Sequence, residues 1–415
     1  MRAQPPFALA RLGSRMFESF APTLAAAQAR IEAVQPVAYA RTRNALGGAV
    51  SRLSPYITHG YVTLAEVLAG VNRRHPLDVQ HKFVYELGWR AYFRHVWHHR
   101  GDGILQSLHP GPLPDEAYAR ELTDDIREAR TGVPVVDEAV RALYATGMLH
   151  NHGRMWLASY VVHVRKLHWR AGADWLYSHL LDGDLASNHL SWQWVAGTGS
   201  SKPYLFNADN VARHAPKPWH SPGSVIDQSY EALDALARQW PVSQVEPSAE
   251  LDRPKISEPQ LQSHPPDALG CTLPQAASVA GREVWLVHPW SLGALPASLP
   301  ADTVIIGIYV ADFHRAWPWS AQRWSFVGSR MAELAAECWH ADAISIGHAL
   351  QGARRVRSIS EPHLPWLTQW AECAAAPALF APVDRRCDSF SQWWARATRG
   401  LNAAADLLTV DKVSS

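Results

Sequence analysis

The segment 243–270, SQVEPSAELDRPKISEPQLQSHPPDALG, divides the sequence into two parts with different hydrophobic patterns. It is rich in proline, serine and charge and has no helical or strand periodicity, which is typical of a linker. At 415 residues the chain is long enough for two hydrophobic cores, since a single core stops growing near about 250–300 residues. The sequence therefore predicts two domains joined by this linker.

The part before the linker is predicted to be all-helical, because apolar residues recur there at helical spacing. The predicted helical segments are 20–75, 79–100, 135–147 and 152–172. Thr63, followed three residues later by Glu66, forms a capping box. Gly147 is placed to cap the third segment, and Gly172 is predicted to end the last one. No segment through residue 200 alternates apolar and polar residues as a strand does.

The part after the linker has the pattern of a small α/β domain. The β-branched apolar runs at 283–290, 302–310 and 342–349 are predicted strands, and 322–339 is a predicted helix. Strands that alternate with helices indicate a mostly parallel sheet. Because no GxGxxG motif accompanies these strands, the pattern does not support dinucleotide binding here.

Composition is that of an ordinary globular protein, with 47% hydrophobic and 19% charged residues. No apolar run approaches the roughly 18–20 residues of a membrane span, and the N-terminus lacks the features of a secretory signal. The four cysteines, Cys271, Cys338, Cys373 and Cys387, form no CxxC pair. We therefore expect free thiols, no metal site, no membrane contact and a cytoplasmic location, with a metal or iron–sulfur site as the minor alternative.

Charge is unevenly distributed along the chain. Residues 1–220 contain 24 Lys and Arg against 18 Asp and Glu, and residues 221–415 contain 15 against 20. The N-terminal part also holds 15 of the 21 histidines. A basic half gives mild support for a polyanionic partner, since phosphate contacts dominate nucleic-acid affinity.

The stretch 180–198, LLDGDLASNHLSWQWVAGT, is the most unusual in the chain. It places Asp182, Asp184 and Asn188 just before Trp192 and Trp194. The tryptophans would be unusual on a surface, and burying the polar side chains in a core would cost free energy. The chain has 19 tryptophans, most of which we expect to pack in the core.

Four segments carry a resemblance to one family. They are SRLSPYITHG (51–60), YELGWRAYFRH (85–95), TGVPVVDEAVRALYATGMLHNHGRMWLASYVV (131–162) and DWLYSHLLDGDLASNHLSWQWVAGTG (174–199). In this order they resemble the flavin-binding domain of the photolyase/cryptochrome family, over roughly residues 1–215. Such a long motif set is far more specific than a lone glycine motif. The all-helical prediction agrees with the helical flavin domain of that family.

The resemblance also bears on domain order. Family members usually begin with an α/β antenna domain, whereas here the flavin domain comes first. The predicted domains are a helical FAD-binding domain at 1–242, a linker at 243–275 and an α/β domain at 276–415. The last domain resembles a rearranged or degenerate antenna domain at EVWLVHPWSLGAL and IIGIYVADF; an unrelated doubly wound domain is the alternative.

The resemblance implies FAD as the cofactor. A buried isoalloxazine carries N–H and C=O groups that need polar partners, which is a reason for polar side chains in this segment. The implied cofactor-binding residues are Tyr39, Ser51, Arg52, Leu53, Ser54, Arg90, Asn151, Arg154, Asp182, Asp184 and Asn188. Asn188 is implied to lie beside flavin N5, where a neutral amide can bond to every redox form. Arg90 and Arg154 are implied to pair with the diphosphate or with a neighbouring carboxylate. Helix caps and surface ion pairs are the alternative reading of this set.

Trp192 and Trp169 match the first two members of the family's tryptophan electron chain. The region 110–125, where the outer member should fall, contains no tryptophan, and Tyr118 is the aromatic residue there. The electron-transfer chain is then truncated, rerouted through Tyr118 or through another tryptophan such as Trp156 or Trp175, or unused. Simple core packing is the alternative for Trp192 and Trp169.

The family holds a flipped pyrimidine dimer over the flavin, with an acid and stacking aromatic rings. The matching substrate residues here are Glu86, Trp89, Asn151, His152, Met155 and Trp194. His152 replaces an arginine of many repair members, Met148 replaces a tryptophan, and the loop SSKPYLFNADN is short. His152 could serve as an acid or mark a lost DNA contact.

The predicted catalytic residues are Glu86, Trp192, Trp169 and Asn188. The predicted function is FAD-dependent, light-driven repair of DNA containing pyrimidine dimers, with Glu86 as a hydrogen-bond donor. The alternative is a cryptochrome-like blue-light photosensor that signals to a partner through the C-terminal domain. A flavoprotein that has lost both activities is the third hypothesis.

Overall fold

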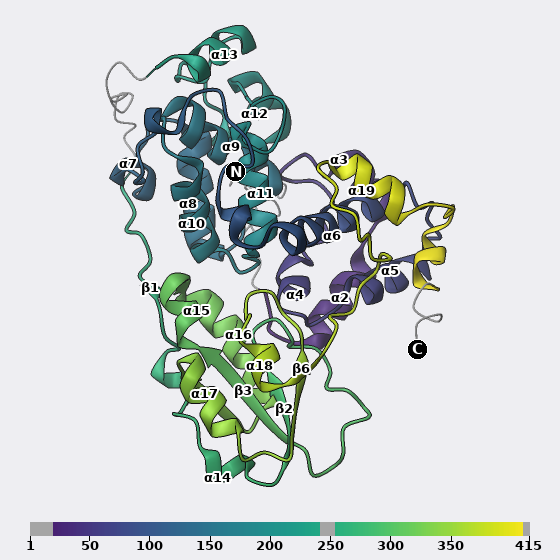
Figure 1. Ribbon diagram of the computed structural model, residues 1–415. Coiled ribbons are helices and arrows are strands. Elements are labelled where there is room, and N and C mark those ends of the chain that lie inside the picture. The colour runs from purple at the N-terminus through teal and green to yellow at the C-terminus, as the bar shows by residue number, and fades with distance from the viewer. Residues whose placement is uncertain (1–19, 241–253, 410–415) are drawn as a thin grey trace, which may run out of the picture.

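The computed structural model describes residues 20–240 and 254–409. In the first range every regular element is a helix, and these helices form the upper and right-hand parts of Figure 1. Their bounds are α2 (Leu24–Ala33), α3 (Pro36–Thr42), α4 (Ser54–Thr58), α5 (Leu64–Asn72), α6 (Lys82–Arg100), η1 (Gly101–Leu105), η2 (Asp115–Ala117), α7 (Asp124–Arg127), α8 (Pro134–Thr146), α9 (Asn151–Ser159), η3 (Tyr160–Val164), α10 (Trp169–His179), α11 (Leu185–Ala196), α12 (Ala208–His214), η4 (Lys217–Trp219) and α13 (Tyr230–Arg238).

Helix ends follow the sequence signals in two places. Thr63 accepts from the Glu66 N–H, and the Glu66 carboxylate accepts from the Thr63 N–H, which confirms the capping box of α5. Helix α8 ends at Gly147, which has φ +64° and ψ 10°. This left-handed conformation favours glycine, so the predicted cap is also confirmed.

The prediction of one helix over 152–172 was wrong. Helix α9 passes at Tyr160 into the π-turn η3, the chain breaks at residues 165–168, and α10 begins at Trp169. Lys166 in the break has φ +52°, so the axis cannot continue. Gly172 lies inside α10, where an added Cβ would stand 2.4 Å from the Trp192 ring. This glycine serves close helix packing and does not end a helix.

The second range contains a parallel α/β unit, drawn mainly in green in the lower part of Figure 1, and then α19 and η6, drawn in yellow at the right. Its elements are β1 (Leu261–Gln262), η5 (Asp267–Leu269), α14 (Ala276–Val279), β2 (Glu283–Val287), β3 (Val304–Val310), α15 (Ala311–Ala316), β4 (Trp319–Ser320), α16 (Ala321–Leu334), β5 (Glu337–Ala341), α17 (Ala343–Leu350), β6 (Arg355–Ile359), α18 (Leu367–Trp370), β7 (Glu372–Ala374), α19 (Phe390–Ala397) and η6 (Ala404–Leu408). The main sheet has the order β5-β3-β2-β6-β7, and all its pairs are parallel. The predicted fold class, α followed by α/β, is confirmed.

Two predicted elements of this unit were wrong. Residues 343–350 form helix α17, not a strand: Asp342 caps it by accepting from the Ser345 N–H, and the buried Ala343, Ile346 and Ala349 have helical spacing. The strand lies just before it, at β5, where the sequence pattern predicted the end of a helix. Helix α16 stops at Leu334 because Cys338 and Trp339 pair with β3.

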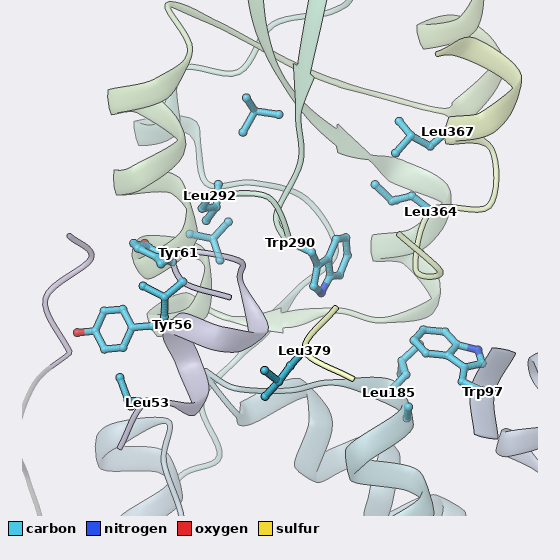
Figure 2. Close-up of a cluster of buried hydrophobic side chains, with 14 of the residues drawn as sticks. Leu53, Tyr56, Tyr61, Trp97, Leu185, Trp290, Leu292, Leu364, Leu367 and Leu379 are labelled. Atoms are coloured by element: carbon cyan, nitrogen blue, oxygen red, sulfur yellow. The ribbon is translucent and has the colours of Figure 1, made fainter. Parts of the chain in front are cut away.

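One hydrophobic cluster joins the helical part to the α/β unit. Trp290, which follows β2, packs in the same cluster as Trp97 of α6, Leu185 of α11 and Leu379 (Figure 2). The Tyr61 hydroxyl also donates to the Phe326 carbonyl at 2.9 Å. The α/β unit therefore packs directly against the elements that carry the predicted flavin residues.

The chain returns to the helical part after β7. Phe390 and Trp394 of α19 pack against α6, and Ala404 of η6 donates its N–H to the Leu77 carbonyl. In Figure 1 the yellow α19 accordingly lies beside α6, far from the sheet. The predicted boundaries at 242, 275 and 276 stay predictions, and part of the linker lies outside the described residues. No helix in the described ranges has the length and apolar character needed to cross a bilayer.

Candidate flavin site

The largest set of predicted residues lines one cavity of about 350 Å³ between α6, α9, α10 and α11. Eleven predicted residues meet there: Glu86, Trp89, Arg90, Asn151, Arg154, Met155, Asp182, Asp184, Asn188, Trp192 and Trp194. These residues come from three of the four motif segments of the sequence, 85–95, 131–162 and 174–199. The fold thus brings the predicted cofactor set and most of the predicted substrate set to one place.

A second cavity of about 290 Å³ continues the first, since Glu86, Asn151, Arg154 and Asp182 line both. The remaining predicted cofactor residues line this second cavity: Tyr39, Ser51, Arg52, Leu53 and Ser54. The two cavities form one elongated cleft, which suits a dinucleotide with a ring at one end and phosphates further along.

Asp182 and Arg154 form the charged centre of the cleft. Arg154 Nη2 contacts both Asp182 oxygens, at 2.9 and 2.8 Å, and the Asp182 side chain is 5% exposed. Burial raises the pKa of the Asp182 carboxyl, but Arg154, Ser54 and Arg90 outweigh burial and hold the pKa below its usual range. The pair is therefore ionised at neutral pH.

Asp184 begins helix α11 and is fully buried. Its Oδ1 accepts from the Ser187 N–H at 2.8 Å, and its Oδ2 pairs with Arg94 of α6. Burial raises the pKa of this carboxyl, but Arg94 and Arg90 reverse the shift and keep the pKa well below its usual range. A permanent negative charge therefore lies in the cavity wall.

Asn188 lies one turn further along α11. Its side-chain amide donates to the Ala173 carbonyl of α10 at 2.8 Å, which fixes the plane of the carboxamide. Arg90 on the facing wall donates to Thr58 Oγ1 at 2.6 Å. Both side chains are held in place by protein partners before any ligand binds.

The cleft fits FAD in one further respect. Ser187 Oγ is buried in its wall and has no hydrogen-bond partner among the residues that the structure describes. Buried polar atoms are nearly always paired, so this hydroxyl calls for a polar ligand. Arg90, Asp182, Asp184 and Asn188 would hold the ring end of FAD, and Ser51 to Ser54 the phosphate side.

The predicted substrate residues are held less firmly. Glu86 pairs with Arg43 at 3.2 Å and its side chain is 40% exposed. Burial raises the pKa of Glu86, an effect that Arg43 opposes only in part. Trp194 is 41% exposed, and the Asn151 amide lies 3.4 Å from the Met155 sulfur.

Two of these residues have neighbours that the sequence did not predict. Trp89 stacks on Phe390 of α19, with ring centroids 4.1 Å apart and planes at 13°. His152 does not line the main cavity; it packs against Trp156 and His214. Burial next to His214 and Arg43 lowers the pKa of His152 to about 4, so this side chain is neutral at pH 7.

Trp169 does not line the cavity, and it lies between two series of neighbouring aromatic rings, each of which is a candidate electron route. On one side the His168 ring is 5.6 Å from Trp169, and Tyr118 is 6.4 Å from His168. On the other side the His189 ring is 6.3 Å from Trp169, and Trp317 is 5.4 Å from His189. Tyr118 is buried and Trp317 is half-buried.

Arg94, Ser187, Glu361, Phe390 and Trp317 were not predicted from the sequence. Arg94 stands four residues after Arg90 on one helix, a spacing that could have indicated it. Ser187 lies within the quoted motif. The other three come from the α/β unit and α19, and no local signal links them to the site.

Comparison with known proteins agrees with this geometry. Residues 83–248 match the family described as the FAD binding domain of DNA photolyase. The chain is 37% identical over 204 residues to a deoxyribodipyrimidine photo-lyase of Thermus thermophilus, covering 47% of each chain. It is 32% identical over 169 residues to a cryptochrome DASH of rice, covering 39% of this chain and 29% of that protein.

Among solved structures, the Synechocystis cryptochrome has 28% identity and a TM-score of 0.41, covering 46% of this chain and 43% of that one. The chain spans between 29% and 47% of the length of the curated relatives compared. Residues 83–248 of the helical part therefore match the FAD binding domain of DNA photolyase, and FAD is the cofactor that this match gives for the domain.

Proposed function

We propose that this protein is a light-driven DNA repair enzyme, a photolyase that splits pyrimidine dimers. One observation supports it above the others: Glu86, Met155 and Trp194 line the same cavity as Asp184 and Asn188, so substrate and cofactor would be in contact. FAD held in this cavity in its reduced form would supply the light-driven electron transfer needed to open the cyclobutane ring.

The chain's own residues would position the lesion. Burial raises the pKa of Glu86 although Arg43 opposes the shift, and once protonated this carboxyl would donate a hydrogen bond to a pyrimidine carbonyl. Trp89 and Trp194 offer ring faces and edges for the splayed bases. Arg43, which pairs with Glu86, would have to release that carboxyl when the lesion enters.

The test is repair of a thymine-dimer oligonucleotide by the reduced holoprotein under blue light, with a dark control. We expect repair in light only. In Glu86→Ala the rate should fall about ten- to a hundredfold, because removing the donor leaves the buried carbonyl unpaired, at a cost of about 1–3 kcal/mol. Glu121→Ala, at an exposed surface glutamate, is the matched control and should repair normally. No repair by holoprotein with a full complement of FAD would exclude the proposal.

A photosensor without repair activity is the second candidate, and a specific observation favours it. The Phe390 ring covers one face of Trp89, and His152 is turned to His214 instead of the cavity. Both features reduce the surface available to a flipped base. For this candidate, light should change the FAD absorption spectrum without repair, and a signalling partner would contact residues 276–415.

A further inference from the structure

The α/β unit contacts the turn that joins the two flavin-site carboxylates. Asp182 and Asp184 flank Gly183, and Arg323 of α16 donates to the Gly183 carbonyl at 2.6 Å. Arg323 is fully buried, and its Nη1 lies 2.5 Å from where a Cβ on Gly183 would stand. The turn between the carboxylates is therefore shaped around a side chain from the other domain.

Glu361, in the loop after β6, makes a second contact through Arg94. Arg94 Nη1 lies 2.7 Å from Glu361 Oε1, and Arg94 Nη2 pairs with Asp184. The Glu361 side chain is only 8% exposed. One guanidinium thus bridges a carboxylate of the cavity wall and a carboxylate of the α/β unit.

The loop that carries Glu361 is held rigidly. His363 Nδ1 contacts Glu361 Oε1 at 2.5 Å, and because an ionised carboxylate can only accept, this nitrogen carries the proton. The His363 ring stacks on Trp290, with centroids 4.3 Å apart and planes at 8°, and meets Trp97 edge-on at 4.8 Å. Trp290 and Trp97 belong to the cluster that joins the two domains (Figure 2).

Charge in this region is nearly balanced. The guanidinium groups of Arg90, Arg94, Arg154 and Arg323 face the carboxylates of Asp182, Asp184 and Glu361. His363 adds no charge at neutral pH, since burial lowers its pKa despite the Glu361 carboxylate. Without Glu361, four positive groups would face two negative ones.

We propose that Glu361 is a positioning residue of the flavin site, through which the α/β unit lowers the reduction potential of bound FAD. Reduction adds negative charge to the flavin, and a buried carboxylate held against Arg94 offsets part of the positive field that would stabilise this charge. Removing the Glu361 charge should therefore favour the reduced form. This inference rests on FAD as the cofactor and is independent of whether the protein repairs DNA.

The test is the midpoint potential of bound FAD, measured by spectroelectrochemical titration of the full-length holoprotein. Glu361→Gln keeps the side-chain shape. In this variant the binding constant of reduced FAD relative to that of oxidised FAD should rise about tenfold, which makes the midpoint potential about 30 mV more positive for a two-electron couple. Glu361→Asp, which keeps the charge, should stay closer to wild type. Glu372→Gln is the matched control, because Glu372 is 62% exposed and pairs with Arg355 in the same domain.

A second pair of variants covers the case in which Glu361→Gln does not fold. Arg94→Gln should make the midpoint potential more negative than that of wild type. The double variant Arg94→Gln with Glu361→Gln should have a potential about 30 mV more positive than that of Arg94→Gln alone. Either pair isolates the effect of the Glu361 charge. Equal potentials within both pairs, with FAD bound, would overturn the proposal.

Discussion

The cofactor wall and the substrate mouth of one cavity are built differently. At the wall, Asp182, Asp184 and Asn188 are buried and each has a named partner in the protein. At the mouth, Glu86 and Trp194 are about two-fifths exposed, and Trp89 is shared with α19. From this difference we infer that cofactor binding depends on side chains that the protein already holds in place, whereas substrate contacts can change without loss of the flavin.

The largest effect is expected at the wall. Asp182→Ala leaves Arg154 without its buried partner, and breaking such a pair costs about 3–5 kcal/mol. We expect purified protein without flavin absorbance and with a clearly lower melting temperature, measured by absorbance at 450 nm and by thermal unfolding. Asp234→Ala removes a surface pair with Arg238 and should change neither quantity. Full FAD content in Asp182→Ala would remove the distinction between wall and mouth.

Acid should weaken the wall in a defined pH range. Burial opposes ionisation of Glu361, but Arg94 and His363 lower its pKa to about 2 from an ordinary value of 4.5. Because the pKa of Glu361 is lower in the folded than in the unfolded state, its ionisation stabilises the fold above pH 4.5. This contribution to the free energy of unfolding, about 3 kcal/mol, is lost as the pH falls from 4.5 to 2. Urea unfolding of wild type and Glu361→Gln should differ most at pH 6, differ less as the pH falls below 4.5, and converge only near pH 2; a constant difference would contradict this.

At the mouth, Phe390→Leu should act on substrate and leave the cofactor unchanged. Loss of the stacked ring removes about 0.5–1.5 kcal/mol of support for Trp89. We expect binding of a dimer-containing oligonucleotide to weaken up to about tenfold, by fluorescence anisotropy, with the FAD spectrum unchanged. Tighter binding would mean that Phe390 blocks the platform and would favour the photosensor alternative.

The smallest effect separates the two aromatic routes from Trp169. Trp317→Phe should slow photoreduction of FAD severalfold if electrons leave through His189, and Tyr118→Phe should slow it if they leave through His168. We expect the first, since Trp317 is half-buried and Tyr118 is buried. Transient absorption after a laser flash measures both, and unchanged kinetics in both variants would mean that neither route is used.

The helical half was predictable because its signals are local. The capping box of α5, the glycine cap of α8 and the motif at 180–198 each depend on neighbouring residues. The failed predictions have tertiary causes. Gly172 was assigned as a helix end although it makes room for Trp192, and 343–350 was assigned as a strand although it forms a helix whose buried face packs in the core.

The same distinction holds within the site. Asp182, Asp184 and Asn188 were recognisable from one short segment. Glu361 and Phe390 lie about 180 to 200 residues further along the chain and reach the site only because the α/β unit and α19 pack on α6 and α11. Neither hydrophobic periodicity nor a motif could indicate contacts of that kind.

The most direct test of the comparison is the FAD content of two variants, Asp184→Asn and Trp194→Ala, purified side by side. Both side chains line the same cavity, one from its wall and one from its mouth. We predict that Asp184→Asn loses most of its FAD whereas Trp194→Ala keeps a full complement. Equal loss in both variants, or full retention in Asp184→Asn, would contradict the account.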